Sequence, residues 1–428
     1  MRTKLFLITL TSLCMTACSN VEEPLASLEN KHKIQIVSRN KRSLEEATIV
    51  AQKAISMLGK AQTRAVNRSI DLSNNRYIVS NTTTRNGETD TLMYVFNYTD
   101  EQGYAIVSAN PETEALIAVT ELGTYTEESE KGNTGLALYM DMARSYTAMP
   151  LGEPISGGIG DVITENKNEI IYDTITHGPY IEVQWGQYTP YNSTCPLDGD
   201  VRCPTGCVAT ALAQILSYYE FPTKMFDEVS GGYFYPGWAD LKKHKNVLSN
   251  DTCNSNRHAT LARVFRSIGE STFMNYSANG SGTSIDWVVY YLTNLQILVS
   301  GPSAFDQDVI NDEILADRVV YIRGSNSKGE GHAWVIDGTM DAINTCNDYV
   351  RPQGQLNWTL LSSVTSHTYY NHFNWGYDGY SNGYFLSKVF DLSNYGLLDE
   401  GVYSTTGDFS NSIKIITNLE MPLLWGEI

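Results

Sequence analysis

Apolar residues recur with two different periods in the first third of the chain. Between Ser43 and Leu58 they follow helical spacing, and Ser43 with Glu46 forms a capping box at the start of this predicted helix. A second helical stripe covers residues 135–146. Between the two helices, short apolar runs predict strands at residues 76–80, 92–98, 103–108 and 117–120. Together these elements predict a small α+β domain over residues 41–148.

The pattern changes at residue 149. Residues 149–180 are polar and rich in turn-forming residues, which predicts an irregular linker and a place where proteases cut. The rest of the chain is richer in aromatic residues and glycine. We therefore expect a second, larger domain at residues 181–428, and a length of 428 residues allows two domains.

The first 18 residues have the pattern of a signal peptide, with a short basic start and an apolar run too short to span a bilayer. Small residues then lead to Cys18, which resembles the lipobox of bacterial lipoproteins, although Met15 stands where leucine is usual. We predict a lipoprotein signal at residues 1–18, lipidation of Cys18 and a polar tether at residues 19–40. An ordinary signal peptide is the alternative. Either form predicts export, to the cell envelope or surface, or to the medium after processing.

The charge of the chain argues against one class of partner. Its 30 lysines and arginines stand against 48 aspartates and glutamates, a formal net charge of −18. This balance argues against a nucleic-acid-binding protein. Hydrophobic residues make up 42% and charged residues 18%, which is typical of a globular protein.

The chain has seven cysteines, and five of them follow the predicted signal. These five are Cys195, Cys203, Cys207, Cys253 and Cys346. An odd number in an exported chain suggests up to two disulfides and one free thiol. Cys195 with Cys203 and Cys253 with Cys346 are the pairings we consider, which would leave Cys207 free.

Cys207 lies at the start of a predicted helix. An apolar stripe begins at Val208, Gly206 comes just before, and Pro222 lies beyond the end. A helix N-terminus carries partial positive charge and favours thiolate over thiol. Taken alone, a small buried cysteine or a disulfide partner of Cys203 would be the simpler interpretation.

A second motif makes catalysis the better interpretation. A predicted strand at residues 319–322 is followed by a polar loop and by a strand that opens with His332. A partly exposed imidazole there can take the thiol proton and later protonate a leaving amine. We predict Cys207 as nucleophile and His332 as its base. His372 fits a surface or packing histidine better.

Asn374 and Trp375 form a third motif. Asn374 is a candidate to orient the imidazole of His332 by accepting its hydrogen bond, and Trp375 to shield that bond from water. Alone, this glycine-rich segment would read as an aromatic hairpin. With the other two motifs it completes the order Cys, His, Asn-Trp, which is the order in papain-like proteases.

The resemblance is closer still to the streptopain family of papain-like cysteine proteases. The matching motifs, in chain order, are Gln187 with 190–192, 206–211 with Gln214, 331–333 with 335–338, and 374–376. This resemblance implies an α+β fold, with a papain-like two-lobed catalytic domain behind a small α+β propeptide domain. It also implies that residues 41–148 are an inhibitory propeptide, that residues 149–180 are the activation linker, and that the substrates are proteins or peptides.

The resemblance also assigns roles to single residues. Gln187 would form the oxyanion hole together with the backbone N–H of Cys207. The implied catalytic set is Cys207, His332, Gln187, Asn374 and Trp375. The implied substrate-binding residues, which would hold an extended peptide backbone, are Ser281, Gly282, Thr283 and Gly331. Many members carry tryptophan where this chain has Tyr377, a change we expect to alter the cleft rim without touching Cys207 or His332.

Alternatives remain open at this point. A zinc site could draw on Cys195, Cys203 and Cys207, although no paired histidines follow at ligand spacing. A surface-binding protein on a degenerate protease fold is another, and a transglutaminase-like or amidase activity on the same Cys-His chemistry is a third. We expect no metal and no cofactor, and we expect the chain's own propeptide to be an intramolecular inhibitor.

Overall fold

The computed structural model describes residues 41–61, 67–83, 89–148, 164–247, 255–325, 331–352, 357–390 and 413–422. The predicted signal, Cys18 and the tether at residues 19–40 therefore lie outside the described residues. So do the first part of the predicted linker and Cys253. None of the described helices combines the length and the apolar character needed to cross a membrane.

The N-terminal domain has the two helices and four strands that its apolar pattern predicts, and the short helices η1, η2 and α3 in addition. They are α2 (Leu44–Ala61), η1 (Leu72–Asn74), β1 (Arg76–Thr83), β2 (Thr89–Asn97), η2 (Thr99–Glu101), β3 (Tyr104–Ser108), β4 (Leu116–Thr120), α3 (Glu127–Gly132) and α4 (Thr134–Thr147). The predicted capping box is present, because Ser43 N donates to Glu46 Oε2 at 2.7 Å and Glu46 N donates to Ser43 Oγ at 3.2 Å.

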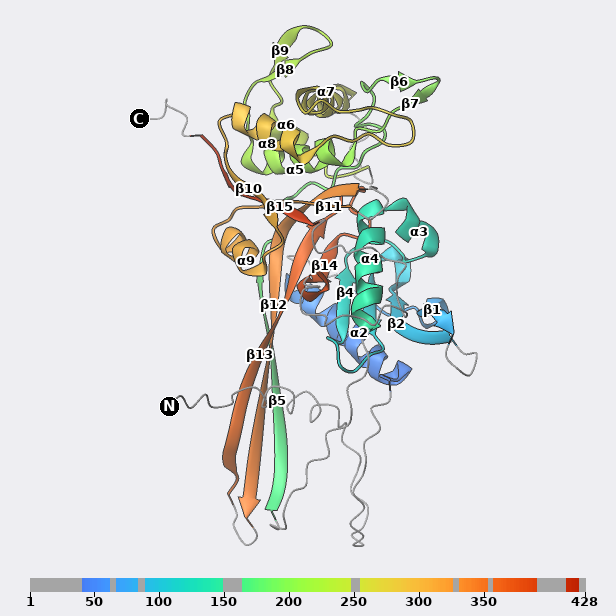
Figure 1. Ribbon diagram of the computed structural model, residues 1–428, viewed down its shortest axis with the longest axis vertical. Coiled ribbons are helices and arrows are strands. Elements are labelled where there is room, and N and C mark those ends of the chain that lie inside the picture. The colour runs from blue at the N-terminus through green and yellow to red at the C-terminus, as the bar shows by residue number, and fades with distance from the viewer. Residues whose placement is uncertain are drawn as a thin grey trace, which may run out of the picture.

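The C-terminal part forms a helical lobe and a sheet lobe (Figure 1). The helical lobe contains β6 (Leu197–Asp198), β7 (Val201–Arg202), α5 (Cys207–Tyr219), β8 (Met225–Asp227), β9 (Gly232–Phe234), α6 (Trp238–Leu241), α7 (Ser255–Ser271) and α8 (Ile285–Asn294). The sheet lobe contains β10 (Leu298–Ala304), α9 (Gln307–Leu315), β11 (Val320–Ser325), β12 (Gly331–Pro352), β13 (Thr359–Asn374), β14 (Gly383–Leu386), η3 (Ser387–Phe390) and β15 (Lys414–Glu420).

One sheet runs through both domains. Its strand order is β1-β2-β3-β4-β14-β13-β12-β11-β15-β10, so the N-terminal sheet joins the C-terminal sheet where β4 pairs with β14. The pairing is antiparallel and places Val119 opposite Tyr384. The N-terminal domain therefore extends the sheet lobe through backbone hydrogen bonds.

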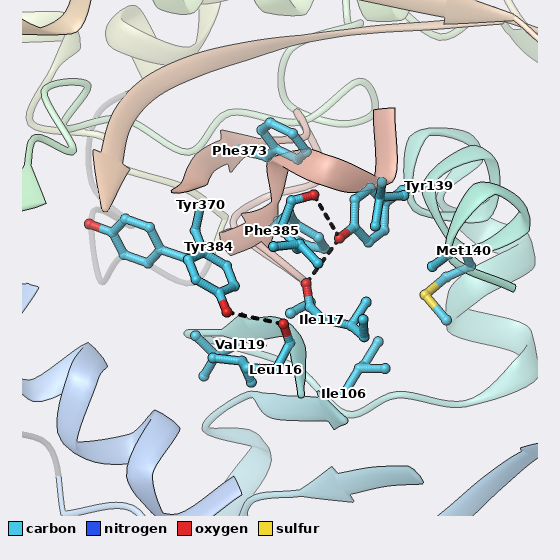
Figure 2. Packing of buried hydrophobic residues seen from close by; sticks show 14 of the residues in the cluster. Ile106, Leu116, Ile117, Val119, Tyr139, Met140, Tyr370, Phe373, Tyr384 and Phe385 are labelled. Carbon is cyan, nitrogen blue, oxygen red and sulfur yellow. Dashed lines mark hydrogen bonds between the residues drawn. The ribbon is translucent and has the colours of Figure 1, made fainter. Parts of the chain in front are cut away.

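The two domains also share a hydrophobic core (Figure 2). Tyr139 of α4 donates its hydroxyl hydrogen to Ile117 O at 2.9 Å and lies 3.3 Å from Leu386 O. Its ring meets Phe385 edge to face, with 4.9 Å between centroids. Tyr370 of β13 donates in the opposite direction, to Leu116 O at 3.1 Å. Separating the domains would expose apolar surface on both sides, which opposes dissociation.

A second core lies inside the helical lobe. Trp185, Leu212 and Phe265 are among its fully buried members. α5 crosses from this core to β12 and β11 of the sheet lobe. The first residue of α5 and the first residues of β12 therefore meet at the boundary between two lobes, as the papain-like prediction requires.

The predicted linker contains a long strand. Residues 149–180 were expected to be irregular, but β5 (Thr164–His177) pairs with β12 in unbroken register from Thr164 opposite Pro352 to His177 opposite Thr339. β5, β12 and β13 form a three-stranded ribbon that projects from the body (Figure 1). The local turn signals are overridden because β12 supplies backbone partners along the whole strand.

Cys195, Cys203 and Cys207 carry free thiols. The bridge considered between Cys195 and Cys203 is therefore absent, and both thiols are buried. Burial as a small apolar thiol is common for cysteine and needs no bridge. Cys346 is a buried thiol on β12, and its pairing with Cys253 stays a prediction.

Candidate active site

Cys207 is the first residue of α5, as predicted. Gly206 precedes it with a φ of 87°, and a Cβ at this position would come within 2.7 Å of Ser281 O. Only glycine tolerates both this backbone conformation and this close approach. The glycine therefore allows the sharp entry that leaves the half-buried Cys207 side chain at the start of the helix.

The surroundings of Cys207 keep its sulfur protonated in this state. Burial raises the pKa of the thiol, and the backbone amides of Ala333 and Val208 and the charge of Arg323 only partly oppose the rise. No contribution comes from an imidazole cation, which is the partner that lowers cysteine pKa values most strongly. The thiolate expected from the helix position is therefore not favoured here.

His332 lies at the start of β12 but is buried, not partly exposed as expected, because the N-terminal domain covers it. Its Nε2 lies 2.8 Å from Trp375 O, and its Nδ1 lies 3.1 Å from Thr134 Oγ1 of α4. Burial lowers the pKa of His332 to about 4, although the Trp375 carbonyl opposes this. The ring is neutral at physiological pH.

The two contacts determine which nitrogen carries the proton. A carbonyl oxygen can only accept, so Nε2–H of His332 donates to Trp375 O and Nδ1 accepts from the Thr134 hydroxyl. The Tyr377 hydroxyl lies 3.3 Å from Thr134 Oγ1 and can donate to it in turn. Both ring nitrogens are thereby occupied, one of them by the N-terminal domain.

Aromatic rings and one glycine enclose the imidazole. Trp334 and Tyr377 stack on it, with centroid distances of 6.0 Å and 5.3 Å. A Cβ at Gly135, the second residue of α4, would come within 2.5 Å of both His332 Cδ2 and Trp375 Cε3. The first turn of α4 therefore packs directly against the histidine, and this contact requires glycine.

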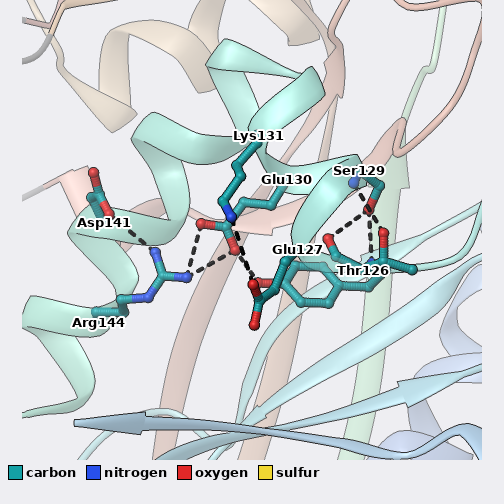
Figure 3. Close-up of polar contacts among 8 residues, drawn as sticks. Thr126, Glu127, Ser129, Glu130, Lys131, Asp141 and Arg144 are labelled. Carbon is teal, nitrogen blue, oxygen red and sulfur yellow. Dashed lines mark hydrogen bonds and ion pairs between the residues drawn. The ribbon is translucent and has the colours of Figure 1, made fainter. Parts of the chain in front are cut away.

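The helix α4 is itself held against α3 (Figure 3). Arg144 binds Glu130 through two contacts of 2.8 Å, which ties α4 to α3. Thr126 and Ser129 form a reciprocal capping box at the start of α3. These contacts fix how α4 lies against α3.

The predicted catalytic pair is not assembled in this state. Among the described residues, no hydrogen bond joins Cys207 to His332, and none joins Asn374 to the imidazole. Asn374 donates to Val183 O at 2.9 Å, and its Oδ1 accepts from Gly376 N at 3.4 Å. The expected Asn374–His332 bond is replaced by the bond to Trp375 O, because α4 holds the ring there.

Trp375 lies beside His332, where the sequence analysis places it. The two ring centroids are 6.4 Å apart, and the indole is fully buried. Its Nε1 donates to Ser381 O at 3.0 Å. This bond fixes the indole and also the carbonyl that accepts from His332.

Gln187 borders a cavity of about 340 Å³ between the two domains. Its backbone oxygen accepts from Thr205 N at 2.9 Å, two residues before Cys207. The other side of the cavity belongs to the N-terminal domain, including Gly132 and Asn133. The candidate oxyanion residue therefore faces a space that the N-terminal domain covers.

The predicted substrate loop is held beside the nucleophile. Ser281 donates its hydroxyl hydrogen to Pro204 O at 2.8 Å. Gly282 exchanges two backbone hydrogen bonds with Asn275, at 2.9 and 3.1 Å. Thr283 O accepts from Arg323 Nη1 at 3.0 Å. The loop is thus a fixed rim next to Gly206.

Gly331 begins β12, directly before His332, and pairs with Ser325 of β11. Its role in substrate binding stays a prediction. In the described part of the chain, no group of three or more histidine, cysteine, aspartate or glutamate side chains is placed to hold a metal ion.

Sequence reasoning missed the residues that hold the histidine. Thr134 and Gly135 looked like the ordinary start of a helix, and Tyr377 was expected to leave the catalytic pair untouched. Tyr377 instead stacks on His332 and contacts Thr134. The only available signal was the tyrosine itself, at a position where related sequences often carry tryptophan.

His372 is also different from expectation. It is buried, with Nδ1 2.6 Å from Asp337 Oδ1 and Nε2 3.7 Å from Glu121 Oε1. Burial alone would lower its pKa, but the two carboxylates outweigh burial and raise the pKa of His372 to about 10. His372 is therefore not a surface histidine: it packs edge to face on Tyr384, as a packing residue would, and it is also a buried cation.

Comparison with known proteins gives matches over most of the chain. Residues 185–385 match the model of the peptidase C10 family, and residues 34–146 match that of the Spi protease inhibitor. The thiol protease/hemagglutinin PrtT of Porphyromonas gingivalis is 25% identical over 358 residues, which cover 77% of this chain but only 38% of PrtT. Streptopain of Streptococcus pyogenes is 25% identical over 352 residues, covering 71% of this chain and 76% of streptopain.

Among solved structures, a fragment of prointerpain A from Prevotella intermedia matches with a TM-score of 0.51 and 19% sequence identity. The match covers 83% of this chain and 100% of that one. The fold is therefore that of a papain-like protease domain with an N-terminal inhibitor domain.

Proposed function

Because the chain belongs to the streptopain, or peptidase C10, family of cysteine proteases and carries the family's inhibitor domain, we propose that it is the zymogen of a cysteine endopeptidase. One observation supports this most directly. His332, the residue predicted to be the base, is held by Thr134 and Gly135 of the N-terminal domain and makes no hydrogen bond to Cys207 in the described part of the chain. A contact of this kind suits an enzyme that must stay inactive until one domain is removed.

In the processed enzyme, removal of α4 frees Nδ1 of His332 to face Cys207. The imidazole takes the proton from Cys207 Sγ, and the thiolate attacks the carbonyl carbon of a peptide bond. Gln187 and the backbone N–H of Cys207 donate to the oxyanion. The imidazolium then protonates the leaving amine, and water hydrolyses the thioester with His332 again as base.

The remaining predicted residues support this pair. In the processed enzyme, Asn374 takes the place of Trp375 O as the acceptor for Nε2–H of His332. The indole of Trp375 shields this hydrogen bond from water. Ser281, Gly282, Thr283 and Gly331 bind the backbone of an extended protein or peptide substrate on the rim beside Cys207. No metal or cofactor takes part.

Activation requires a cut between α4 and β5. The fourteen-residue strand β5 is paired with β12, which begins next to His332. Cutting inside β5 would first require the strand to leave the ribbon, whereas cutting before Thr164 leaves the ribbon intact. We therefore place the cut between Thr147 and Thr164, and the processed enzyme keeps β5.

We also propose that the precursor is exported and anchored through a lipid on Cys18. The support is the sequence pattern of residues 1–18. Replacing Cys18 with serine should move the protein from the membrane fraction to the soluble fraction of a cell extract. Unchanged membrane association would contradict the anchor.

The test of the nucleophile is the intact mass of the chain without residues 1–18, after incubation with reductant. Wild-type protein should shorten to a fragment that begins before Thr164 and should then hydrolyse casein. Cys207→Ala should stay at full length and inactive. Cys346→Ala, which removes another cysteine, on the projecting ribbon, is the matched control and should process like wild type under the same reducing conditions. Casein hydrolysis by Cys207→Ala would show that the nucleophile is wrongly assigned.

A further inference from the structure

A buried ion cluster joins the two domains outside the active site. It consists of Glu121, Asp337 and His372 and is called here the interdomain ion cluster. The side chains of Asp337 and His372 are 1% and 4% exposed, and that of Glu121 is 14% exposed. His372 lies between the two carboxylates, 2.6 Å from Asp337 and 3.7 Å from Glu121.

Two members of the cluster are fixed within the C-terminal domain. Asp337 Oδ2 accepts from Ile181 N at 3.1 Å, and its backbone oxygen accepts from Tyr180 N at 2.9 Å. His372 lies on β13 in the centre of the sheet. The pair of Asp337 and His372 therefore does not depend on the N-terminal domain for its position.

Glu121 is the member supplied by the N-terminal domain. It follows β4, the strand that pairs with β14 across the domain boundary. Its backbone N–H donates to Asn382 O at 2.9 Å, and its backbone oxygen accepts from Arg68 Nη2 at 3.3 Å. Both bonds fix the residue at the point where the two sheets join, with its carboxylate toward His372.

Another ion pair also crosses the domain boundary, but it is far more exposed. Lys388 binds Glu114 with 47% of the lysine and 17% of the glutamate side chain exposed, so it is the cation that lies in solvent here, whereas His372 is buried. Water and salt screen such a pair, so its loss has little effect. The Glu121 carboxylate instead faces a histidine whose side chain is only 4% exposed, where water and salt screen the attraction far less. Charge recognition between the domains should therefore concentrate at Glu121.

We infer that Glu121 is the recognition residue through which the N-terminal domain docks on its protease, and that the Asp337–His372 pair is the docking site for this carboxylate. The site lies on the strands behind the cleft and does not include Cys207 or His332. By holding β4 on β14, it keeps the whole N-terminal domain, and with it α4, against the histidine. The docking role of Glu121 can be measured without catalysis. Only its consequence, that docking keeps His332 covered and the enzyme inactive, rests on the proposed zymogen function.

The experiment uses the full chain without residues 1–18, in the inactive Cys207→Ala background. Hydrogen exchange of the β4 segment is followed by mass spectrometry with Glu121→Gln, and with Lys388→Gln as the matched control. Glutamine keeps the size of glutamate and removes only its charge. We expect β4 amides to exchange roughly ten- to a hundred-fold faster in Glu121→Gln, and within about two-fold of the parent in Lys388→Gln. Exchange of α5 should be unchanged, which separates undocking from global unfolding.

The same substitutions in the active chain separate the two proposals. Residue 121 is removed on activation, so the processed enzyme from Glu121→Gln has the wild-type sequence and should hydrolyse casein at the wild-type rate. Its precursor should be processed at least about ten-fold sooner. Unchanged β4 exchange, or equal acceleration by Lys388→Gln, would overturn the docking role of Glu121. Faster exchange without any casein hydrolysis in any variant would keep the docking site and remove the proposed peptidase function.

Discussion

Replacing Gly135 with alanine should convert the zymogen into a chain that activates far more readily. The added methyl group would come within 2.5 Å of His332 Cδ2 and of Trp375 Cε3. Carbon atoms in contact lie about 3.5–4.0 Å apart, so one of the groups has to move by about 1 Å or more. Trp375 is fully buried and bonded to Ser381, which leaves α4 or His332 to move.

The magnitude follows from overpacking. Forcing an extra methyl group into a packed contact costs about 1–3 kcal/mol. Alanine favours the helix itself by about 1 kcal/mol relative to glycine, so α4 should not unravel. The cost therefore falls on the contact with His332, and release should become roughly five- to a hundred-fold more favourable.

The assay is the time course of processing, followed by intact mass, for chains that lack residues 1–18. Gly132→Ala is the matched control, because a Cβ at Gly132 has no atom within 4 Å. Both positions lie in the domain that is removed, so all processed enzymes are identical in sequence. Wild-type and Gly132→Ala chains should process at similar rates, and Gly135→Ala several-fold faster or more.

One result would refute the reasoning. If Gly135→Ala processes at the rate of wild type while its N-terminal domain is folded, the first turn of α4 does not control His332. A wild-type rate in both glycine variants would have the same meaning. Faster processing in both would instead indicate a general weakening of the α3–α4 region.

Two further predictions concern the same histidine. Thr134→Val removes the donor to Nδ1 of His332 and leaves this buried nitrogen unpaired, which destabilises the docked state by about 1–3 kcal/mol. Processing should therefore accelerate. Thr134→Ser, which keeps the hydroxyl, should process at the wild-type rate. The pKa of His332 is about 4 in the docked state, below its ordinary value of about 6.5. Between these two pH values the undocked state binds more protons than the docked state. Docking therefore weakens as the pH falls from about 6.5 to about 4. Release should be about ten-fold more favourable at pH 5.5 than at pH 7.5, measured as hydrogen exchange of α4 in Cys207→Ala and corrected for intrinsic rates. His372 should not oppose this trend, since Asp337 stays beside it after release, and the trend should disappear when His332 is replaced by glutamine.

Local patterns in the sequence were enough to predict elements whose stabilising contacts are local. The capping box of Ser43 and Glu46, and the glycine that precedes Cys207, act within a few residues of the elements they begin. The Cys207 helix and the strand that opens with His332 were predicted from such signals. Short-range chemistry of this kind can be read from one sequence.

The features that could not be predicted depend on distant partners. The strand β5 exists because β12 pairs with it more than 160 residues later in the chain. Thr134 and His332 are separated by 198 positions, and nothing in the residues around Thr134 indicates an imidazole neighbour. The burial of His332 follows from that one contact, and so does its hydrogen bond to Trp375 O in place of the expected bond to Asn374. Periodicity and local spacing carry no information about it.

In the proposed zymogen, a small contact is enough for inhibition. In the docked state, burial raises the pKa of Cys207 and lowers that of His332, so at neutral pH the sulfur keeps its proton and the ring is uncharged. When a thiol and an imidazole meet at a helix N-terminus, each stabilises the charge of the other and both shifts reverse. The N-terminal domain therefore does not need to distort Cys207 at all. In the proposed mechanism, holding one ring nitrogen through Thr134 keeps the nucleophile protonated and the base neutral, and releasing it restores both reactive forms together.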